Sequence, residues 1–213
     1  MTTSDVAAIR TQPVNFIASL GLGYTYTMYT IVGLGNPGEK YELTRHNAGQ
    51  IVLRKVFADI QSLSVGQIER VTLSGADCRV AFPDTYMNES GNFVRRLLNG
   101  DKADNLIVVY DDVDLPLGEF KITFGRGDGG HNGVASIINN LQTKDFVRIR
   151  IGISKKNFWG NKVRVKGEEL ADFVLGRLSP KEIKVLENLA PRIKEVLETT
   201  VKDGVAVAMN RFN

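Results

Sequence analysis

The sequence has 213 residues, enough for one sizeable hydrophobic core, and its 43% hydrophobic and 24% charged residues exclude a wholly disordered or fibrous chain. Its formal net charge of +3 neither demands nor excludes a polyanionic partner, so the placement of the charges must decide. The single cysteine, Cys78, has no partner for an internal disulfide, which is typical of a reducing compartment, and we expect it to be a buried structural thiol.

Residues 1–27 differ in character from the rest of the chain. No charged residue lies between Arg10 and Glu39, yet polar residues interrupt the apolar ones too often for a membrane span. A secretory signal would need a basic start and a continuous apolar core, and this segment has neither. We therefore expect residues 1–27 to be a poorly ordered extension and residues 28–213 to form the domain.

The first half of the domain is predicted to alternate between strands and helices. Apolar runs and period-two alternation indicate strands, whereas apolar residues three and four positions apart indicate helices. In chain order the predicted elements are a strand at residues 30–34, a helix at 47–61, a strand pair at 67–73 and 77–82, and a helix at 92–99. The first strand ends in Gly35-Asn36-Pro37-Gly38, where the glycines permit backbone shapes that other residues avoid.

The second half continues this pattern. In chain order we expect a strand at residues 105–110, a strand at 118–124, a glycine-rich loop at 125–130, a helix ending near Leu141, and a strand at 146–154. The strand at 105–110 is predicted to end at Asp111. In the last strand Val147 and Ile149 share one face, and Arg148 and Arg150 share the other.

The C-terminal region has the clearest helix signals. Ser179-Pro180-Lys181-Glu182 is typical of a capping box with proline at the first helical position, and Pro191 is expected to kink or split the helix that follows. The preceding residues 155–167 are polar and basic with two aromatic residues, which favours a mobile loop that projects from the core. Strands alternating with helices predict a single α/β domain with a mixed, mostly parallel central sheet flanked by helices.

Two glycine-rich segments suggest phosphate binding. Residues 33–38 satisfy the dinucleotide pattern G-x-G-x-x-G, but that function requires a helix to begin inside the glycine run. Here Pro37 interrupts the run and the helical spacing starts only after Asn47, so we consider the match accidental. The loop at 125–130 lacks the Lys-Ser/Thr ending of a P-loop, and a phosphate cradle and an ordinary flexible connection both remain open for it.

The two histidines, His46 and His131, are the candidates for acid–base chemistry. Each is followed by an asparagine, and Asp111 lies where a strand is predicted to end. A histidine held by a carboxylate next to amide side chains is a plausible base for activating water. The chain has no G-x-S-x-G elbow for a covalent route and no CxxC or HExxH zinc motif. These residues favour a hydrolase that uses direct water attack.

At these positions the sequence resembles bacterial-type peptidyl-tRNA hydrolases. The resemblance spans essentially everything from Met28 onward, in several separate motifs in the right order. These motifs are IVGLGNPGEKYELTRHNAG at 31–49, TYMNESG at 85–91, VVYDDVDLPLGEFK at 108–121, GGHNG at 129–133, RIRIGI at 148–153 and DFVLGRLS at 172–179.

The resemblance implies hydrolysis of the ester that joins a peptide to the 3′ ribose of tRNA. It implies that His46 is the catalytic base, that Asp111 orients it, and that residues 168–178 form a lid. The residues that it assigns to positioning substrate and water are Asn36, Tyr41, Met87, Asn88 and Asn132. It implies no cofactor and no metal, a cytoplasmic location and a monomer.

The tRNA is expected to be held by its backbone, because its charge is constant while its sequence varies. The candidates are Lys121, Arg126, Arg148, Arg150 and the lysines of the 155–166 region. The chain departs from the family at Thr123, where a lysine would pair with the arginine matching Arg150 to hold the 5′ phosphate. Lys121 or Arg126 could substitute for it.

Two other functions are compatible with parts of the sequence. One is a non-catalytic RNA-binding module of the same fold, such as the related chloroplast splicing cofactors. The retained His46, Asp111 and asparagines favour the enzyme over this module. The other is a nucleotide-dependent oxidoreductase, which the position of Pro37 disfavours.

Overall fold

The structure is a computed structural model that describes residues 28–60, 62–154 and 168–213. The predicted N-terminal extension and the polar segment at 155–167 lie outside these ranges. Within them, six strands form one sheet in the order β2-β3-β1-β4-β6-β5. The strands are β1 (Tyr29–Gly33), β2 (Ile68–Leu73), β3 (Ala76–Ala81), β4 (Leu106–Pro116), β5 (Phe120–Phe124) and β6 (Val147–Ser154).

The four inner strands, β3, β1, β4 and β6, pair in parallel, and the two edge strands pair antiparallel to their neighbours. This confirms the prediction of a mixed, mostly parallel sheet. No helix begins within residues 33–38, since the first helical turn after β1 starts at Arg45. The helix start that the dinucleotide pattern requires is therefore absent from residues 33–38.

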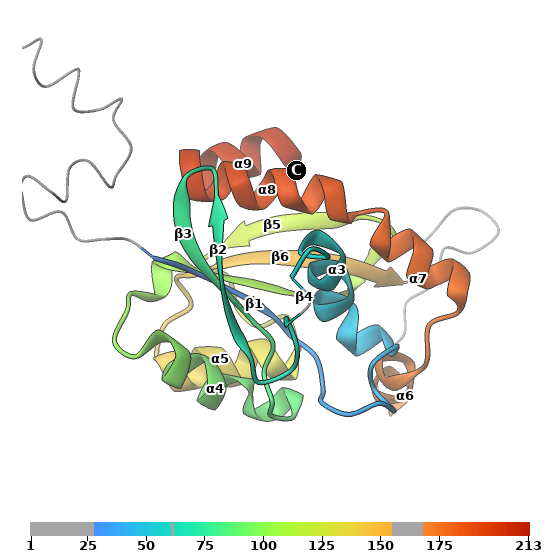
Figure 1. Cartoon of the computed structure of the whole chain (residues 1–213). Helices are drawn as coiled ribbons and strands as arrows, with labels where there is room; N and C mark the ends of the chain where they lie inside the picture. Colours follow the sequence, from blue (N-terminus) through green and yellow to red (C-terminus); the bar gives the residue numbers. More distant parts are fainter. Residues whose placement is uncertain (1–27, 61, 155–167) are drawn as a thin grey trace, which may run out of the picture.

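Helices cover both faces of the sheet (Figure 1). They are η1 (Arg45–Asn47), α3 (Ala48–Val56), η2 (Met87–Glu89), α4 (Ser90–Leu98), η3 (Ala103–Asn105), α5 (Asn132–Leu141), α6 (Glu168–Leu175), α7 (Pro180–Glu187), α8 (Ala190–Asp203) and α9 (Val205–Phe212). α3 and α8 pack on one face and α4 and α5 on the other, which gives two buried apolar clusters.

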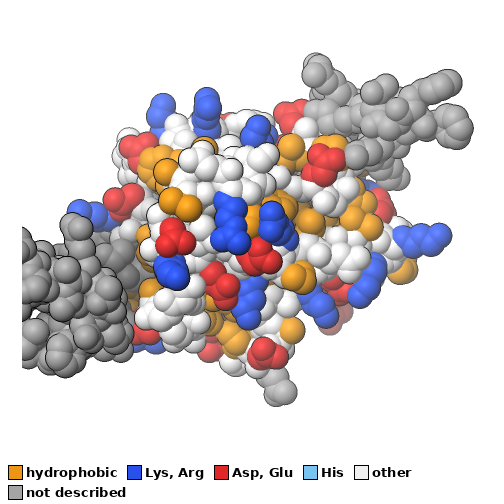
Figure 2. All heavy atoms as spheres, turned by 90° about the horizontal axis from the view of Figure 1, so that it is seen from above, with side chains coloured by type: hydrophobic (Ala, Val, Ile, Leu, Met, Phe, Trp, Pro, Cys, Tyr) orange, Lys and Arg blue, Asp and Glu red, His pale blue; other side chains and the backbone are white. Residues whose placement is uncertain are grey.

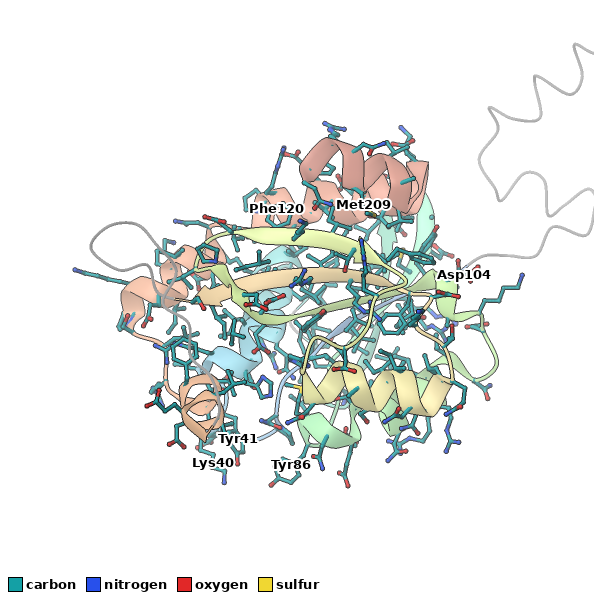
Figure 3. All side chains as sticks on the ribbon, turned by 180° about the vertical axis from the view of Figure 1, so that it is seen from behind. Lys40, Tyr41, Tyr86, Asp104, Phe120 and Met209 are labelled. Atoms are coloured by element: carbon teal, nitrogen blue, oxygen red, sulfur yellow. The ribbon has the colours of Figure 1, made fainter. Side chains whose placement is uncertain are left out.

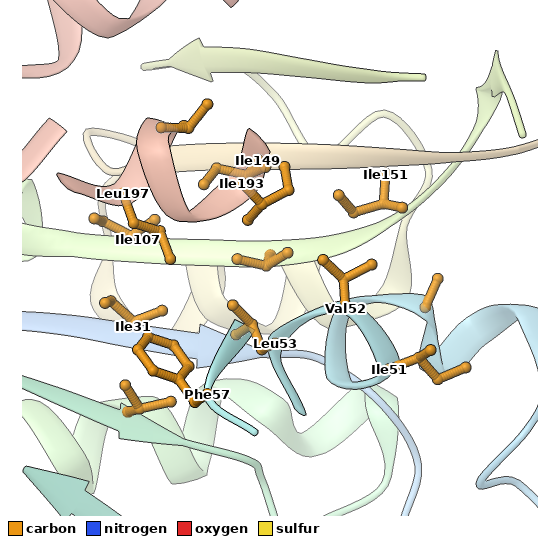
Figure 4. Packing of buried hydrophobic residues seen from close by; sticks show 14 of the residues in the cluster. Ile31, Ile51, Val52, Leu53, Phe57, Ile107, Ile149, Ile151, Ile193 and Leu197 are labelled. Carbon is orange, nitrogen blue, oxygen red and sulfur yellow. The ribbon is translucent and has the colours of Figure 1, made fainter. Parts of the chain in front are cut away.

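The larger cluster shows why β6 lies where it does. Ile149 and Ile151 are fully buried with Ile193 and Leu197 of α8 (Figure 4). Arg148 and Arg150 alternate with these isoleucines along β6, and their side chains lie on the opposite face of the sheet, as predicted. The larger cluster also contains Cys78, which is fully buried, and this burial raises the pKa of its thiol to about 11.

β4 is longer than predicted. It runs through Asp111 to Pro116, with a register shift against β6 between Asp112 and Pro116. The two aspartates fit inside a strand because each has a cationic or imidazole partner from another element, as described below. Conversely, α3 ends at Val56, five residues before the predicted end at 61, and Phe57 turns into the core.

The C-terminal region follows its proline and capping signals. The Oγ of Ser179 accepts from the Glu182 N–H at 3.3 Å, and the Glu182 carboxylate accepts from the Ser179 N–H at 2.8 Å. Pro191 splits the predicted helix, because α7 ends at Glu187 and Pro191 lies in the first turn of α8. Among the described residues, no helix combines the length and the apolar character needed to cross a bilayer.

Close backbone packing at Gly49 joins α3 to β4. A Cβ at this position would lie 2.2 Å from the Val109 carbonyl oxygen, a backbone atom that cannot move aside. We expect Gly49→Ala to lower the free energy of unfolding by about 1–3 kcal/mol, as overpacking typically does. Urea denaturation measures the change.

Gly127→Ala is the matched control, since a Cβ there meets no atom within 4 Å. We expect it to change the free energy of unfolding by less than about 0.5 kcal/mol. Equal losses in the two variants would contradict the close contact at Gly49.

Candidate active site

The candidate site lies where the chain connections of the two central strands, β1 and β4, leave in opposite directions. From β1 the chain passes to β2 and β3 on one side, and from β4 it passes to β5 and β6 on the other. Open α/β sheets bind ligands at such a point, outside the carboxyl ends of their strands. The loop after β1 supplies Asn36, η1 supplies His46, β4 supplies Asp111, and His131 caps the start of α5.

One carboxylate oxygen joins two histidines at the centre of this site. The Oδ1 of Asp111 lies 2.8 Å from the Nδ1 of His46 and 2.9 Å from the Nε2 of His131. The two imidazole centroids are 4.9 Å apart. Because Asp111 is 2% exposed, it depends on these partners for solvation. The structure thus brings the predicted pair His46 and Asp111 together and adds His131, the second histidine that the sequence offers for acid–base chemistry.

The charge state of this cluster follows from its geometry. Burial alone would raise the pKa of Asp111, but the two histidines hold it well below its usual range. For His46, burial lowers the pKa, whereas the charge and hydrogen bond of Asp111 raise it, and the net result lies above the usual value. An ionised carboxylate can only accept, so the nitrogens facing it both donate. His46 consequently carries its proton on Nδ1 and keeps Nε2 free as a base.

His131 is fixed by a second contact at its other nitrogen. Its Nδ1 accepts from the Val134 N–H at 3.3 Å, as the cap of α5, so its proton lies on Nε2 and is donated to Asp111. Tyr110 packs against the same ring with a centroid distance of 4.8 Å. Burial raises the pKa of Tyr110 to about 12, so it stays a neutral phenol.

Asn47 ties the turn carrying His46 to the loop carrying Asn36. Its Oδ1 accepts from the Asn36 N–H at 2.8 Å, and its Nδ2 donates to the Asn36 carbonyl at 3.0 Å. The Oδ1 of Asn36 in turn accepts from the Met87 N–H at 2.8 Å. This contact fixes the orientation of the Asn36 amide and leaves its NH₂ group as the donor available to a ligand.

The other predicted substrate contacts surround this network. Met87 is buried against the first turn of α5, whereas Asn88 and Asn132 are exposed at the starts of neighbouring helical turns. Tyr41 makes an edge-on contact with the exposed Tyr86, at a centroid distance of 6.3 Å. These two rings lie together at one end of the molecule, beside Lys40 (Figure 3).

A pocket of about 700 Å³ extends from the histidines toward β5 and β6. His46, Asp111 and His131 line it, as do the loop residues 126–130 and the α6 residues Leu170, Ala171 and Val174. Three predicted tRNA contacts also line it: Lys121, Arg126 and Arg150. Lys121 lies directly across the antiparallel ladder from Arg150.

Arg148 lies differently from the expectation of an RNA-contacting surface residue. Its guanidinium is 0% exposed, stacks on Phe146 at 4.3 Å and donates to the Lys144 carbonyl at 3.4 Å. Its Nε and Nη1 have no hydrogen-bond partner among the described residues, and neither does the Oγ1 of Thr123, its cross-strand neighbour. Arg148 therefore does not present its guanidinium on the surface, where an RNA phosphate would meet it.

Tyr110 and Asp112 are site residues that the sequence patterns did not identify. Asp112 forms an ion pair with the Nε of Arg150 and accepts from the Asp114 N–H at 2.6 Å. The available signal was position, since both residues flank Asp111. His131 had a stronger signal, because it directly precedes Asn132 in GGHNG.

The cluster also has the residue types of a metal site. One ligand atom from each of His46, Asp111 and His131 lies within 4.8 Å of the others. The two ring nitrogens that face the Asp111 oxygen are engaged in its hydrogen bonds, so a cation bound between these three atoms would have to displace both imidazole protons.

Comparison with known proteins identifies a family that this chain matches. The family described as peptidyl-tRNA hydrolase matches residues 30–213. A peptidyl-tRNA hydrolase of Alkaliphilus oremlandii is 40% identical over 194 residues, which cover 87% of this chain and 100% of that protein. One of Dehalococcoides mccartyi is 39% identical with the same coverage. A crystal structure of peptidyl-tRNA hydrolase from Acinetobacter baumannii has a TM-score of 0.75 at 29% identity, covering 90% of this chain and 97% of that one.

The opposing effects on His46 give a testable shift. In Asp111→Asn the raising charge is lost while burial remains, so we expect the pKa of His46 to fall below its usual value of about 6.5. NMR titration of the imidazole carbons measures it. Asp112→Asn is the control, because Asp112 pairs with Arg150 and not with His46. A His46 pKa that stays high in Asp111→Asn would show that the carboxylate is not its source.

Proposed function

Because the chain belongs to the peptidyl-tRNA hydrolase family, we propose that the pocket is where water hydrolyses the ester between a peptide and the 3′ ribose of tRNA, with His46 as the base. The chain is a hydrolase acting on peptidyl-tRNA, and the non-catalytic RNA-binding alternative is not supported. The observation that carries the catalytic assignment is the 2.8 Å contact between His46 and Asp111, which leaves the Nε2 of His46 unprotonated at the pocket wall.

In this mechanism the Nε2 of His46 takes a proton from a water molecule as that water attacks the ester carbonyl. The Asp111 carboxylate holds the imidazole in the required tautomer and stabilises the imidazolium that forms. General-base catalysis of this kind contributes about 10² to 10⁴ in rate. Returning the proton to the ribose oxygen releases tRNA and restores neutral His46.

The amide side chains supply the complementary donors. Asn36 offers its NH₂ group, because its oxygen is engaged by the Met87 N–H, and such a donor suits the negative charge that develops on the carbonyl oxygen. Asn88 and Asn132 are exposed beside it and are assigned to substrate and water positioning. Met87 provides the apolar wall, and Tyr41 the outer contact of the substrate.

We assign the tRNA phosphates to the β5–β6 end of the pocket. Lys121 and Arg150 are like charges directly opposite on an antiparallel pair, an arrangement that an anion between them would stabilise. In this assignment Lys121 takes the place of the family lysine that is Thr123 here, and Arg126 adds a contact from the loop. On the face that carries α8 and α9, acidic and basic groups are interspersed, which disfavours it as an RNA footprint (Figure 2).

The remaining assignments follow from the substrate. We propose that the protein works in the cytoplasm, where translation supplies peptidyl-tRNA, and that it acts as a monomer. No metal ion is needed in this mechanism, because His46 itself activates the water.

His46→Ala tests the base assignment. We expect the rate of cleavage of N-blocked aminoacyl-tRNA to fall by about 10² or more, while the dissociation constant for tRNA stays within about threefold. Single-turnover cleavage and filter binding measure the two quantities. Unblocked aminoacyl-tRNA serves as the substrate control and is expected to remain intact. Cleavage at an undiminished rate would remove His46 from the mechanism.

Lys121→Gln tests the phosphate assignment. We expect weaker tRNA binding and a decrease of about one in the slope of log affinity against log salt concentration, because one phosphate contact is lost. Lys202→Gln, at an exposed position of α8, is the matched control. Identical salt slopes in the two variants would exclude Lys121 from the contact.

A further inference from the structure

Arg45, the residue before the catalytic base, is buried and directed away from it. Its side chain is 8% exposed, and its Nη2 forms an ion pair of 3.0 Å with Glu182 of α7, which is itself 17% exposed. The guanidinium stacks on the Phe173 ring of α6 at 4.7 Å, and Nη1 lies 3.5 Å from the Phe173 carbonyl. The mechanism above makes no use of this cation.

The backbone around Arg45 is joined to the same region. The Arg45 N–H donates to the Gly176 carbonyl at 3.1 Å, and the Leu178 N–H donates to the Leu43 carbonyl at 2.8 Å. The absence of a side chain at Gly176 leaves room for the guanidinium, because a Cβ there would lie 2.8 Å from the Nη1 of Arg45. Side chain and backbone therefore tie η1 to both ends of the connection between α6 and α7.

This connection matters because α6 forms part of the pocket. Leu170, Ala171 and Val174 line it together with His46, and Phe173 of the same helix is the residue that Arg45 stacks on. Any displacement of α6 relative to η1 would change the width of the pocket beside His46. Arg45 is therefore attached to the same helix that forms this wall of the pocket.

Burying this cation is costly, which argues against a role as mere filling. The Nε of Arg45 has no hydrogen-bond partner among the residues that the structure describes, so part of its lost hydration is uncompensated. Apolar residues of similar volume often replace a buried ion pair without loss of stability. The planar guanidinium offers what they cannot, which is stacking and directional bonds to two helices at once.

We propose that Arg45 is a positioning residue that holds the α6 wall of the pocket at a fixed place relative to the Nε2 of His46. This inference rests on the proposed function for its kinetic consequence. Its structural part, the attachment of α6 to η1, stands independently. Arg45 acts through α6 on substrate binding, whereas Asp111 acts through the imidazole on proton transfer.

Arg45→Met tests this, because it keeps the apolar stem and removes the charged plane. We expect the KM for N-blocked aminoacyl-tRNA to rise about tenfold, the size of one charged hydrogen bond. We expect kcat to change less than about threefold and the acid limb of the pH profile to stay in place, since His46 and Asp111 are untouched. Arg45→Lys, which can still pair with Glu182, should recover part of the KM.

Hydrogen exchange of the free protein gives the second readout. We expect backbone amides of α6 to exchange at least about tenfold faster in Arg45→Met, while those of β4 and β6 are unchanged. Phe173→Leu should have the same effect on α6 through loss of the stacking. Lys184→Met is the control, since it removes the ion pair of α7 between Lys184 and Glu187 and leaves the contact between Arg45 and Glu182.

These measurements separate the possible failures. An unchanged KM with unchanged exchange in α6 would overturn the proposal, and so would a fall in kcat accompanied by a shifted pH profile. Faster exchange throughout the molecule, equal in Arg45→Met and Lys184→Met, would reduce Arg45 to a general stabilising residue and also overturn it. Absence of hydrolysis by the unaltered protein would instead contradict the proposed function, and the exchange data would still judge the attachment of α6.

Discussion

The site depends on a single buried oxygen. The Oδ1 of Asp111 accepts from His46 and from His131. Asp111 belongs to β4, His46 belongs to η1, and His131 lies at the start of α5. Moving an ionised carboxylate out of water costs several kcal/mol, and two charge-assisted hydrogen bonds offset that cost only while both rings keep their places. The requirement of the Asp111 carboxylate for two hydrogen-bond donors thereby fixes the positions of β4, η1 and the start of α5 relative to one another. It also sets the chemistry, because the same bond decides which nitrogen of His46 is free.

The turn η1 distributes this constraint to the rest of the pocket. Its three residues contact three different parts of the fold: Arg45 contacts α6 and α7, His46 contacts β4, and Asn47 contacts the loop after β1. Asn36 passes the connection on to Met87 and thus to the start of α4. The proposed base His46, the proposed oxyanion donor Asn36 and the α6 wall of the pocket are consequently held by three residues that are neighbours in sequence. A short turn in which every side chain is engaged is well suited to fixing groups within the small tolerances that catalysis requires.

Much of the fold could be predicted, because strand alternation, capping and proline signals are local. The β6 pattern, the Ser179 cap and the split at Pro191 are all read from adjacent residues. The continuation of β4 past Asp111 could not be read in this way. An aspartate there resembles a strand end until its partner is known, and His46 lies 65 residues away. The burial of Arg148 was missed for the same reason, since alternation gives the face of a side chain but not what covers that face. The pairing of His46 with Asp111 came from the family resemblance, whereas the role of His131 required coordinates.

The burial of Cys78 in β3 has a practical consequence. It is the sole sulfhydryl in the sequence, it is fully buried, and its raised pKa keeps it protonated at neutral pH. Electrophiles that modify thiolates will therefore reach it only when β3 transiently separates from its neighbours. The rate at which the Cys78 sulfur is alkylated thus reports how often the sheet opens locally, and no labelled residue has to be introduced to measure it.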